Sequence, residues 1–94
     1  MYSYYLSSEA KEDLKRLYYY GVIRFGIVQA DIYYNMIHDC FDRIESNPYV
    51  FPSAEHIKRG FRYCVAGLDT IYYKIEKNNR IEIIAIIGRQ DFPK

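Results

Sequence analysis

The sequence predicts an α+β fold: an N-terminal strand, an α-helical hairpin and then a three-stranded antiparallel meander, with the helices packed on one face of the sheet. Two patterns in the spacing of apolar residues predict this fold. Apolar residues recur at helical spacing through the first half of the 94-residue chain. From residue 61 onward they alternate with a period of two, in runs that turn residues separate. The length predicts a single domain that covers residues 1–94.

The opening residues predict a short strand that leads directly into a helix. Residues Tyr2 to Leu6 alternate loosely and are rich in tyrosine. Ser7 is a suitable N-cap, and Glu9 lies in the first turn, where the helix dipole favours a carboxylate. Apolar positions follow at spacings of three and four residues. We expect this helix to end at Gly26.

A second helix is predicted from about Val28 to Glu45, because an apolar stripe runs along that segment. The stripe consists of Ala30, Tyr33, Tyr34, Ile37, Cys40, Phe41 and Ile44. Asn47-Pro48 ends the helix. Since very few residues separate the two helices, they must fold back on each other as an antiparallel hairpin.

Three strands are predicted after a proline-containing loop over residues 48–59. In the first strand, one face carries Phe61, Tyr63 and Val65, and the other carries Arg62 and Cys64. In the last strand, one face carries Ile81, Ile83, Ala85 and Ile87, and the other carries Glu82, Ile84 and Ile86. Because the last strand is apolar on both faces toward its end, we expect it to be central in the sheet. The N-terminal strand is expected beside it, in a non-local pairing that can run parallel.

The composition excludes several classes of protein. No apolar run approaches the length of about 20 residues that a bilayer-spanning helix needs, and the N-terminus lacks the regions of a signal peptide. We therefore expect a cytoplasmic protein that does not bind a membrane. The two cysteines, Cys40 and Cys64, are too few for a disulfide scaffold, and we interpret both as small buried residues. With His38 and His56 they do not show the close ligand pairs of a zinc site, so no metal or cofactor is expected.

The charge of the chain is nearly balanced. Thirteen basic and 12 acidic side chains give a net charge of +1, which disfavours nucleic-acid binding through massed phosphate neutralisation. Residues 1–47 carry five basic and seven acidic side chains, whereas residues 48–94 carry eight basic and five acidic ones. The sheet half is therefore the more positive of the two.

Six segments, taken in order, carry a resemblance to a known family. They are Leu6-Ser7-Ser8-Glu9-Ala10 with Asp13-Leu14, Tyr20 to Gly26, Asn47-Pro48, Arg59-Gly60-Phe61-Arg62, Ile71-Tyr72-Tyr73 and Ile83 to Asp91. This order resembles the RelE/ParE toxin superfamily, on the ParE side. These are the toxins of type II toxin–antitoxin modules, often called plasmid stabilisation proteins. The resemblance implies the fold above and an antitoxin whose C-terminal segment wraps the toxin.

Two activities are implied by the resemblance, because RelE-type members cleave mRNA in the ribosomal A site and ParE-type members poison DNA gyrase. Cleavage of RNA needs a base for the 2′-OH, an acid for the leaving oxygen and cations for the phosphate. Here Gly88 stands where many relatives carry His, and the residues after it include neither His nor Tyr. We interpret His38 as a residue at the edge of the core and His56 as a solvated loop residue. Arginines can hold a phosphate but cannot act as a base.

We therefore expect a non-enzymatic ParE-like toxin that binds gyrase and is held inactive in a hetero-oligomer with a ParD-like antitoxin. The candidate target contacts are Arg59, Arg62, Arg89, Gln90 and Asp91. The candidate antitoxin contacts are Leu17, Tyr18, Tyr19, Tyr20, Tyr33 and Tyr34, in a groove formed by the hairpin and an exposed sheet edge. We expect no direct contact with nucleic acid. Two alternatives stay open: a ribosome-dependent mRNA endonuclease of the RelE type, and a non-toxic binding module of the same fold.

Overall fold

The computed structural model describes residues 1–88 and confirms the predicted order of elements. The elements are β1 (Ser3–Leu6), α1 (Ser8–Phe25), α2 (Ile27–Ser46), β2 (Phe61–Ala66), β3 (Asp69–Ile75) and β4 (Arg80–Gly88). A short 3-10 turn at Lys77–Asn79 joins the last two strands. Asn78 and Asn79 have φ angles of 61° and 60° there, which asparagine tolerates better than most residues.

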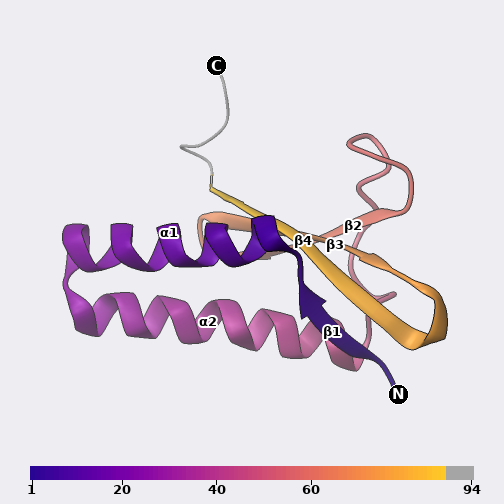
Figure 1. Cartoon of the computed structure of the whole chain (residues 1–94), viewed down its shortest axis with the longest axis horizontal. Helices are drawn as coiled ribbons and strands as arrows, with labels where there is room; N and C mark the ends of the chain where they lie inside the picture. Colours follow the sequence, from indigo (N-terminus) through magenta and orange to yellow (C-terminus); the bar gives the residue numbers. More distant parts are fainter. Residues whose placement is uncertain (89–94) are drawn as a thin grey trace.

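The four strands form one mixed sheet in the order β1-β4-β3-β2. β1 runs parallel to β4, in a register that pairs Ser3 with Arg80 and Leu6 with Ile83. β3 is antiparallel to both β4 and β2. Figure 1 shows β1 and β4, from the two ends of the described chain, side by side. The central position of β4 and its pairing with β1 confirm the expectations from the sequence.

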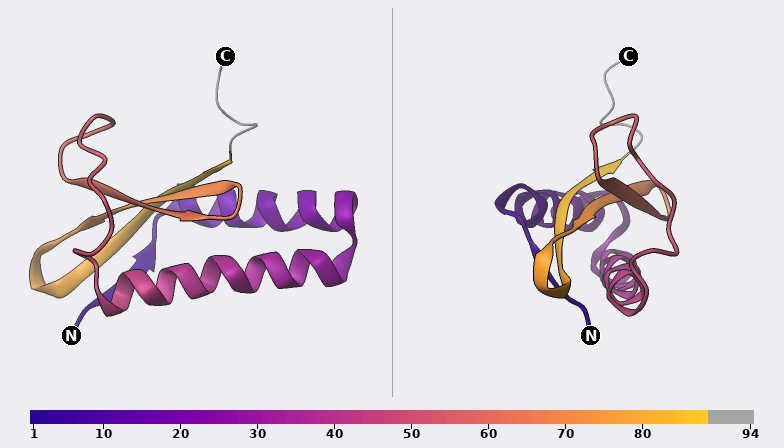
Figure 2. Two further views of the ribbon diagram at one scale, coloured as in Figure 1. Left: turned by 180° about the vertical axis from the view of Figure 1, so that it is seen from behind. Right: turned by 90° about the vertical axis from the view of Figure 1, so that its right-hand side faces the viewer.

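The two helices form an antiparallel hairpin. Ser7 caps α1 as predicted, because its hydroxyl accepts the N–H of Ala10 at 3.0 Å. Gly26 ends α1 with a φ of 90°, a conformation that favours glycine, and α2 begins at the next residue. One end of the hairpin packs against a face of the sheet, and the end where the helices join extends past the strands (Figures 1 and 2).

The core lies between the hairpin and that face of the sheet. Its fully buried side chains from α2 include Ile37, Phe41 and Ile44. The strands contribute Ile71, Tyr73, Ile81, Ile83 and Ile86. The hydroxyl of Tyr73 donates to the carbonyl of Pro48, so its polar tip is satisfied inside the core. Desolvation raises the pKa of this phenol well above its ordinary value.

A β-bulge interrupts the pairing of β3 with β4. Tyr73 pairs with Ile83, but Tyr72 pairs with Ala85. Ile84 is therefore the extra residue on β4, and the strand changes the side to which its residues point.

This bulge makes the predicted faces of the last strand wrong beyond Ile83. Ile86, expected on the face of Glu82, instead belongs to the core and is 1% exposed. Ala85 and Ile87, expected beside Ile83, lie on the opposite side of the sheet. A strict alternation cannot predict this change, because one inserted residue exchanges the two faces.

Polar side chains at the start of α1 hold β4 beside the bulge. The hydroxyl of Ser7 donates to the carbonyl of Ile84 at 2.8 Å. The carboxylate of Asp13, a residue that is 7% exposed, accepts the N–H of Ile86 at 2.9 Å. Because β1 ends at Leu6, these contacts satisfy backbone groups of β4 that have no strand beside them.

β2 forms an edge of the sheet and turns its small residues toward the core. Cys64 and Ala66 are 2% exposed, whereas Val65 is 57% exposed. The predicted division of β2 into two faces is confirmed by the pairing of Cys64 with the core residue Ile71. The loop over residues 47–60 covers part of this edge, since the N–H of Tyr63 bonds to the carbonyl of Pro52 at 3.1 Å.

Candidate functional site

The predicted site residues fall on two surfaces: the hairpin and the face of the sheet that the hairpin does not cover. The helices of the hairpin approach closely because small residues face each other. A Cβ added at Gly21 would lie 3.4 Å from the Cβ of Ala30. Larger side chains flank this contact and shape the surface around it.

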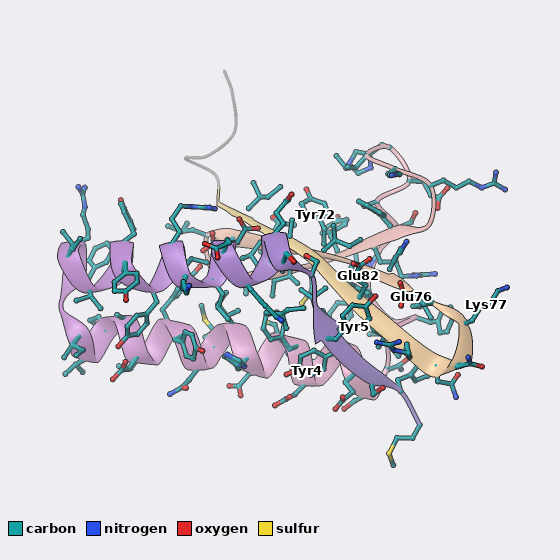
Figure 3. All side chains as sticks on the ribbon, viewed as in Figure 1. Tyr4, Tyr5, Tyr72, Glu76, Lys77 and Glu82 are labelled. Carbon is teal, nitrogen blue, oxygen red and sulfur yellow. The ribbon has the colours of Figure 1, made fainter. Side chains whose placement is uncertain are left out.

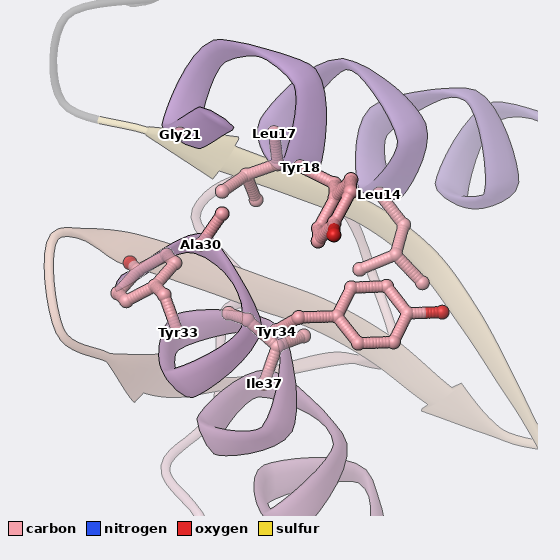
Figure 4. Close-up of a pocket in the computed structure, with 8 residues that line it drawn as sticks. All are labelled: Leu14, Leu17, Tyr18, Gly21, Ala30, Tyr33, Tyr34 and Ile37. Carbon is pink, nitrogen blue, oxygen red and sulfur yellow. The ribbon is translucent and has the colours of Figure 1, made fainter. Parts of the chain in front are cut away.

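A small cavity of about 20 Å³ lies between the helices. Figure 4 shows its lining, which consists of Leu14, Leu17, Tyr18, Gly21, Ala30, Tyr33, Tyr34 and Ile37. This is about the space of one water molecule, so the cavity is too small for an organic ligand. A partner of the hairpin must therefore bind on its outside.

The larger concave feature is a groove of about 450 Å³ on the outside of the hairpin. It is lined by Leu6, Lys11, Leu14, Lys15, Tyr18, Tyr19, Asp31 and Tyr34. Leu6 comes from β1, and the other residues come from the two helices. We call this feature the hairpin groove. Its combination of an apolar floor and charged walls suits an amphipathic segment of another protein.

Aromatic rings continue along the hairpin from the groove. The ring centroids of Tyr18 and Tyr34 are 5.5 Å apart, those of Tyr34 and His38 are 4.6 Å apart, and those of His38 and Phe41 are 5.2 Å apart. Tyr4 of β1 contacts Phe41 at 5.5 Å. Among the described residues, His38 Nε2 is a buried side-chain atom without a hydrogen-bond partner. His38 is half-buried in this row, which confirms its predicted position at the edge of the core.

One hydrogen bond joins the two walls of the hairpin groove. The hydroxyl of Tyr18 on α1 donates to the carboxylate of Asp31 on α2 at 2.7 Å. This bond raises the pKa of the Tyr18 phenol, because ionisation would bring two negative charges together. Tyr18 therefore keeps its proton and holds its ring across the floor of the groove.

The residues predicted to contact the antitoxin lie in three different places. Tyr18, Tyr19 and Tyr34 line the hairpin groove. Leu17 and Tyr33 are partly buried and pack against the core. Tyr20, by contrast, is 46% exposed but is not part of the groove lining. The structure thus brings three of the six together on one accessible surface.

Tyr33 has a separate role, because it fastens α2 to the turn between β2 and β3. Its hydroxyl bonds to the carboxylate of Asp69 and accepts the N–H of Leu68 at 3.2 Å. Desolvation and the bond to Asp69 raise the pKa of the Tyr33 phenol. The turn depends on Gly67, whose φ is 61° and where an added Cβ would lie 2.8 Å from the Tyr33 ring.

The face of the sheet opposite the hairpin, which we call the open face, is rich in tyrosine. Tyr63 and Tyr72 pair across β2 and β3 with ring centroids 6.4 Å apart. Tyr5 lies on the same face, because its neighbour Tyr4 packs against Phe41 in the core. These three tyrosines are half-buried and so remain partly accessible.

Charged side chains at one end of the open face are paired with their neighbours. Lys74 Nζ lies 4.0 Å from Glu82 Oε1. The hydroxyl of Tyr5 donates to the carboxylate of Glu76 at 3.0 Å, and the Arg80 guanidinium lies 4.5 Å from the centroid of the Tyr5 ring. Figure 3 shows Tyr5, Glu76 and Glu82 together at this end of the sheet. Two cations and two carboxylates give this cluster no net charge.

The predicted target contacts Arg62 and Arg59 have different surroundings. Arg62 donates to the carbonyl of Phe51 at 2.7 Å, and its guanidinium lies 5.2 Å from the centroid of the Tyr49 ring. Arg62 therefore holds the loop over residues 47–60 against β2. Arg59 is exposed on that loop, as is His56, whose predicted exposure is confirmed. The other predicted contacts, Arg89, Gln90 and Asp91, lie outside the described residues.

Sequence reasoning missed the charged residues of the hairpin groove, namely Lys11, Lys15 and Asp31. A signal for two of them was present. Lys11 and Lys15 are four residues apart, so they share one side of a helix, and Tyr18 follows three residues later. Asp31 had no such signal, because its place in the groove depends on how α2 packs against α1.

The cysteines and the possible metal ligands of the described residues form no reactive or metal-binding site. Cys40 and Cys64 are free and buried, and desolvation raises the pKa of the Cys64 thiol to about 12. Within residues 1–88, no three His, Cys, Asp or Glu side chains gather as metal ligands. Neither helix of this part of the chain is long and apolar enough to cross a bilayer.

The sequence matches one family over residues 4–92, described as ParE toxin of type II toxin–antitoxin system, parDE. Toxin ParE1 of Caulobacter vibrioides is 30% identical over 87 residues, which cover 93% of this chain and 88% of that protein. Toxin ParE1 of Mycobacterium tuberculosis is 26% identical over 87 residues, which cover 93% of this chain and 89% of that protein.

A solved structure supports the fold. The structure described as the chromosomal ParDE TA system from P. aeruginosa matches with a TM-score of 0.82. The match covers 94% of this chain and 96% of that chain, at 17% sequence identity. At this identity the similarity concerns the arrangement of helices and strands and not the chemistry of individual residues.

Proposed function

The chain belongs to the family of ParE toxins of type II toxin–antitoxin systems, and we propose that it is a non-enzymatic toxin that inhibits DNA gyrase by binding. A ParD-like antitoxin neutralises it in a hetero-oligomer. The observation that carries the proposal is the chemistry of the open face. Its tyrosines are partly accessible, whereas its charges are paired within the molecule. Such a surface suits a protein partner, since tyrosine is enriched at protein interfaces.

The positions of the proton-transferring residues support binding over RNA cleavage. His38 lies in the aromatic row on the hairpin, away from the open face. His56 is exposed on the loop before β2. Arg62 is bound to loop carbonyls, and the cluster around Glu76 has no net charge with which to attract a phosphate. Inhibition of gyrase by binding does not require an acid or a base at these positions. It requires only shape and polar complementarity to the target.

The hairpin groove is the antitoxin site in this proposal. It offers an apolar floor between charged walls, and three of the predicted antitoxin contacts line it. A disordered segment that folds on binding can bury its apolar side there. The groove and the open face lie on opposite sides of the sheet, so the antitoxin need not compete with the target for the same residues.

The test is a supercoiling assay with pure toxin, gyrase and relaxed plasmid. Wild-type toxin is expected to inhibit supercoiling, and Tyr63→Ser/Tyr72→Ser is expected to inhibit at least about tenfold less, as for the loss of central interface tyrosines. The matched control is Ile23→Ser/Ile32→Ser, whose residues are 86% and 57% exposed on the hairpin. The control should inhibit like wild type. Failure of wild-type toxin to inhibit gyrase would count against the proposal.

A second candidate, the ribosome-dependent mRNA endonuclease, is favoured by one observation. The cluster of Tyr5, Glu76 and Arg80 places a carboxylate, a phenol and a cation within contact on the open face. Desolvation and the bond to Glu76 raise the pKa of the Tyr5 phenol, so it keeps its proton as an acid must. Reporter mRNA in a translating extract decides between the two. Cleavage by wild type but not by Glu76→Gln would establish the endonuclease, and inactivity in both assays would leave a non-toxic binding module.

A further inference from the structure

The two walls of the hairpin groove carry opposite charge. Lys11 and Lys15 lie one turn apart on α1, and both line the groove. Their ammonium groups are exposed, and Lys15 Nζ reaches the Glu12 carboxylate only at 3.9 Å, with both side chains about 70% exposed. An exposed pair of this kind is weak, so the α1 wall stays cationic toward a partner.

The α2 wall is acidic. Asp31 lines the groove from α2, where its carboxylate accepts the hydroxyl of Tyr18. Further along α2, Asp42 and Glu45 lie 11 and 14 residues beyond Asp31, close to three and four full turns, so all three share one side of the helix. Asp42 directly follows Phe41, whose ring belongs to the aromatic row. Both carboxylates are therefore near the end of the aromatic row that starts in the groove. The acidic side chains follow α2 on the same side of the hairpin.

The floor between these walls is apolar and close to continuous. Leu6, Leu14, Tyr18 and Tyr34 form its middle. The ring contacts through His38 and Phe41 extend it toward Tyr4. A third helix can lie along two antiparallel helices at the usual interaxial distance of about 8–10 Å, with its own apolar stripe on such a floor.

We propose that the antitoxin segment seated in this groove is an amphipathic helix with a fixed charge polarity: carboxylates on the flank that faces α1, and lysine or arginine on the flank that faces α2. This inference rests on the proposed function, because it names the chemistry of the antitoxin that the groove accepts. The opposed walls then select the cognate antitoxin. A helix with the same apolar stripe but exchanged flanks would place like charges against both walls, which is an effective way to reject a wrong partner.

The test measures binding of the full-length cognate ParD-like antitoxin by titration calorimetry. The variant Lys11→Glu/Lys15→Glu turns two attractive contacts into repulsive ones and is expected to raise Kd by about 10- to 100-fold. The control, Lys58→Glu/Lys77→Glu, makes the same change in net charge at exposed residues outside the groove lining. Its Kd should stay within about threefold of wild type. The difference should shrink at high salt, because both lysines are exposed.

A charge-exchange experiment tests the proposed charge polarity of the antitoxin helix. The variant Lys11→Glu/Lys15→Glu/Asp31→Lys/Asp42→Lys/Glu45→Lys exchanges the walls, and it should bind best to an antitoxin whose flanks have been exchanged in the same way. Circular dichroism melts check that each toxin variant is folded. If Lys11→Glu/Lys15→Glu and the control Lys58→Glu/Lys77→Glu weaken binding equally, the effect is one of net charge and the inference is wrong. It is equally wrong if Lys11→Glu/Lys15→Glu binds like wild type, although the proposed function then stands.

The outcomes separate the inference from the proposal on which it rests. An antitoxin that does not bind wild-type toxin overturns the antitoxin part of the proposed function, and the groove inference with it. Tight wild-type binding with no dependence on the wall charges overturns the inference alone. Gyrase inhibition is measured in a different assay, so its result does not affect this comparison.

Discussion

The carboxylate of Asp13 on α1 accepts the backbone N–H of Ile86 on β4 at 2.9 Å. Asp13→Ala leaves this buried N–H without a partner, so we expect a loss of about 1–3 kcal/mol in the free energy of unfolding, measured with urea. The neighbouring variant Glu12→Ala is the control, because Glu12 is exposed and its change should stay within about 0.5 kcal/mol. Equal stability of the two variants would show that the bond contributes little.

Gly67 is expected to tolerate alanine less well than Gly60. Both have positive φ angles, 61° and 85°, so alanine strains the backbone at either position. At Gly67 the new Cβ would also lie 2.8 Å from the Tyr33 ring, whereas at Gly60 nothing lies within 4 Å. Gly67→Ala should therefore cost at least about 1 kcal/mol more in urea unfolding. Equal costs would mean that Tyr33 moves aside freely.

Arg62 and Arg59 should respond differently to alanine. Arg62→Ala removes a charged donor from the Phe51 carbonyl and is expected to cost about 1–2 kcal/mol and to speed hydrogen exchange in the loop over residues 47–60. Arg59→Ala, at an exposed position, should change stability by less than about 0.5 kcal/mol. A loss of gyrase inhibition in Arg59→Ala would then identify a target contact. In Arg62→Ala the same loss would be ambiguous, because the loop itself is disturbed.

Alkaline pH should destabilise the fold partly through Tyr73. Its pKa is raised above the ordinary value of 10.0 by desolvation, so above pH 10 the unfolded chain loses this proton while the folded protein keeps it. The contribution to stability is therefore full below pH 10 and falls as the pH rises, with a slope of at most about 1.4 kcal/mol per pH unit. Tyr73→Phe removes this ionisation, so the stability difference between wild type and variant should shrink between pH 9 and 11. Parallel curves would contradict the assignment.

The two cysteines should resist a thiol reagent at pH 8 while the protein is folded. Thiolates are the reactive form, and burial raises the pKa of Cys64 to about 12. Both thiols should react rapidly in denaturant. The control is Val65→Cys, because Val65 is 57% exposed beside Cys64 and its thiol should react in the folded state. Rapid labelling of wild type would indicate that the α2–β2 contact opens readily.

Most of the fold could be predicted from the sequence, because the signals were local. The serine cap at Ser7, the glycine stop at Gly26 and the change from helical to alternating period each act within a few residues. The central place of the last strand followed from its apolar residues on both faces. The bulge at Ile84 had no such signal, since it depends on how β4 meets β3. One unpaired residue moved Ile86 into the core.

The site was less predictable, because it depends on which way each side chain points after packing. The run Tyr18-Tyr19-Tyr20 guaranteed exposed tyrosine, but only the packing of α1 against α2 decided that Tyr18 and Tyr19 line the groove. Tyr33 belonged to the same apolar stripe as Tyr34, yet its hydroxyl is bound to Asp69 beside the turn between β2 and β3 and does not line the groove. The use of Arg62 as a loop anchor likewise depends on where the loop carbonyls lie.

The pairing of Ser3 with Arg80 ties the start of the sheet to its last strand. During synthesis β1 leaves the ribosome long before β4 exists, so β1 and the first turn of α1 must wait without their main partner. Contacts of such sequence separation are slow to form. A nascent toxin therefore does not complete its sheet until nearly the whole described chain has been translated.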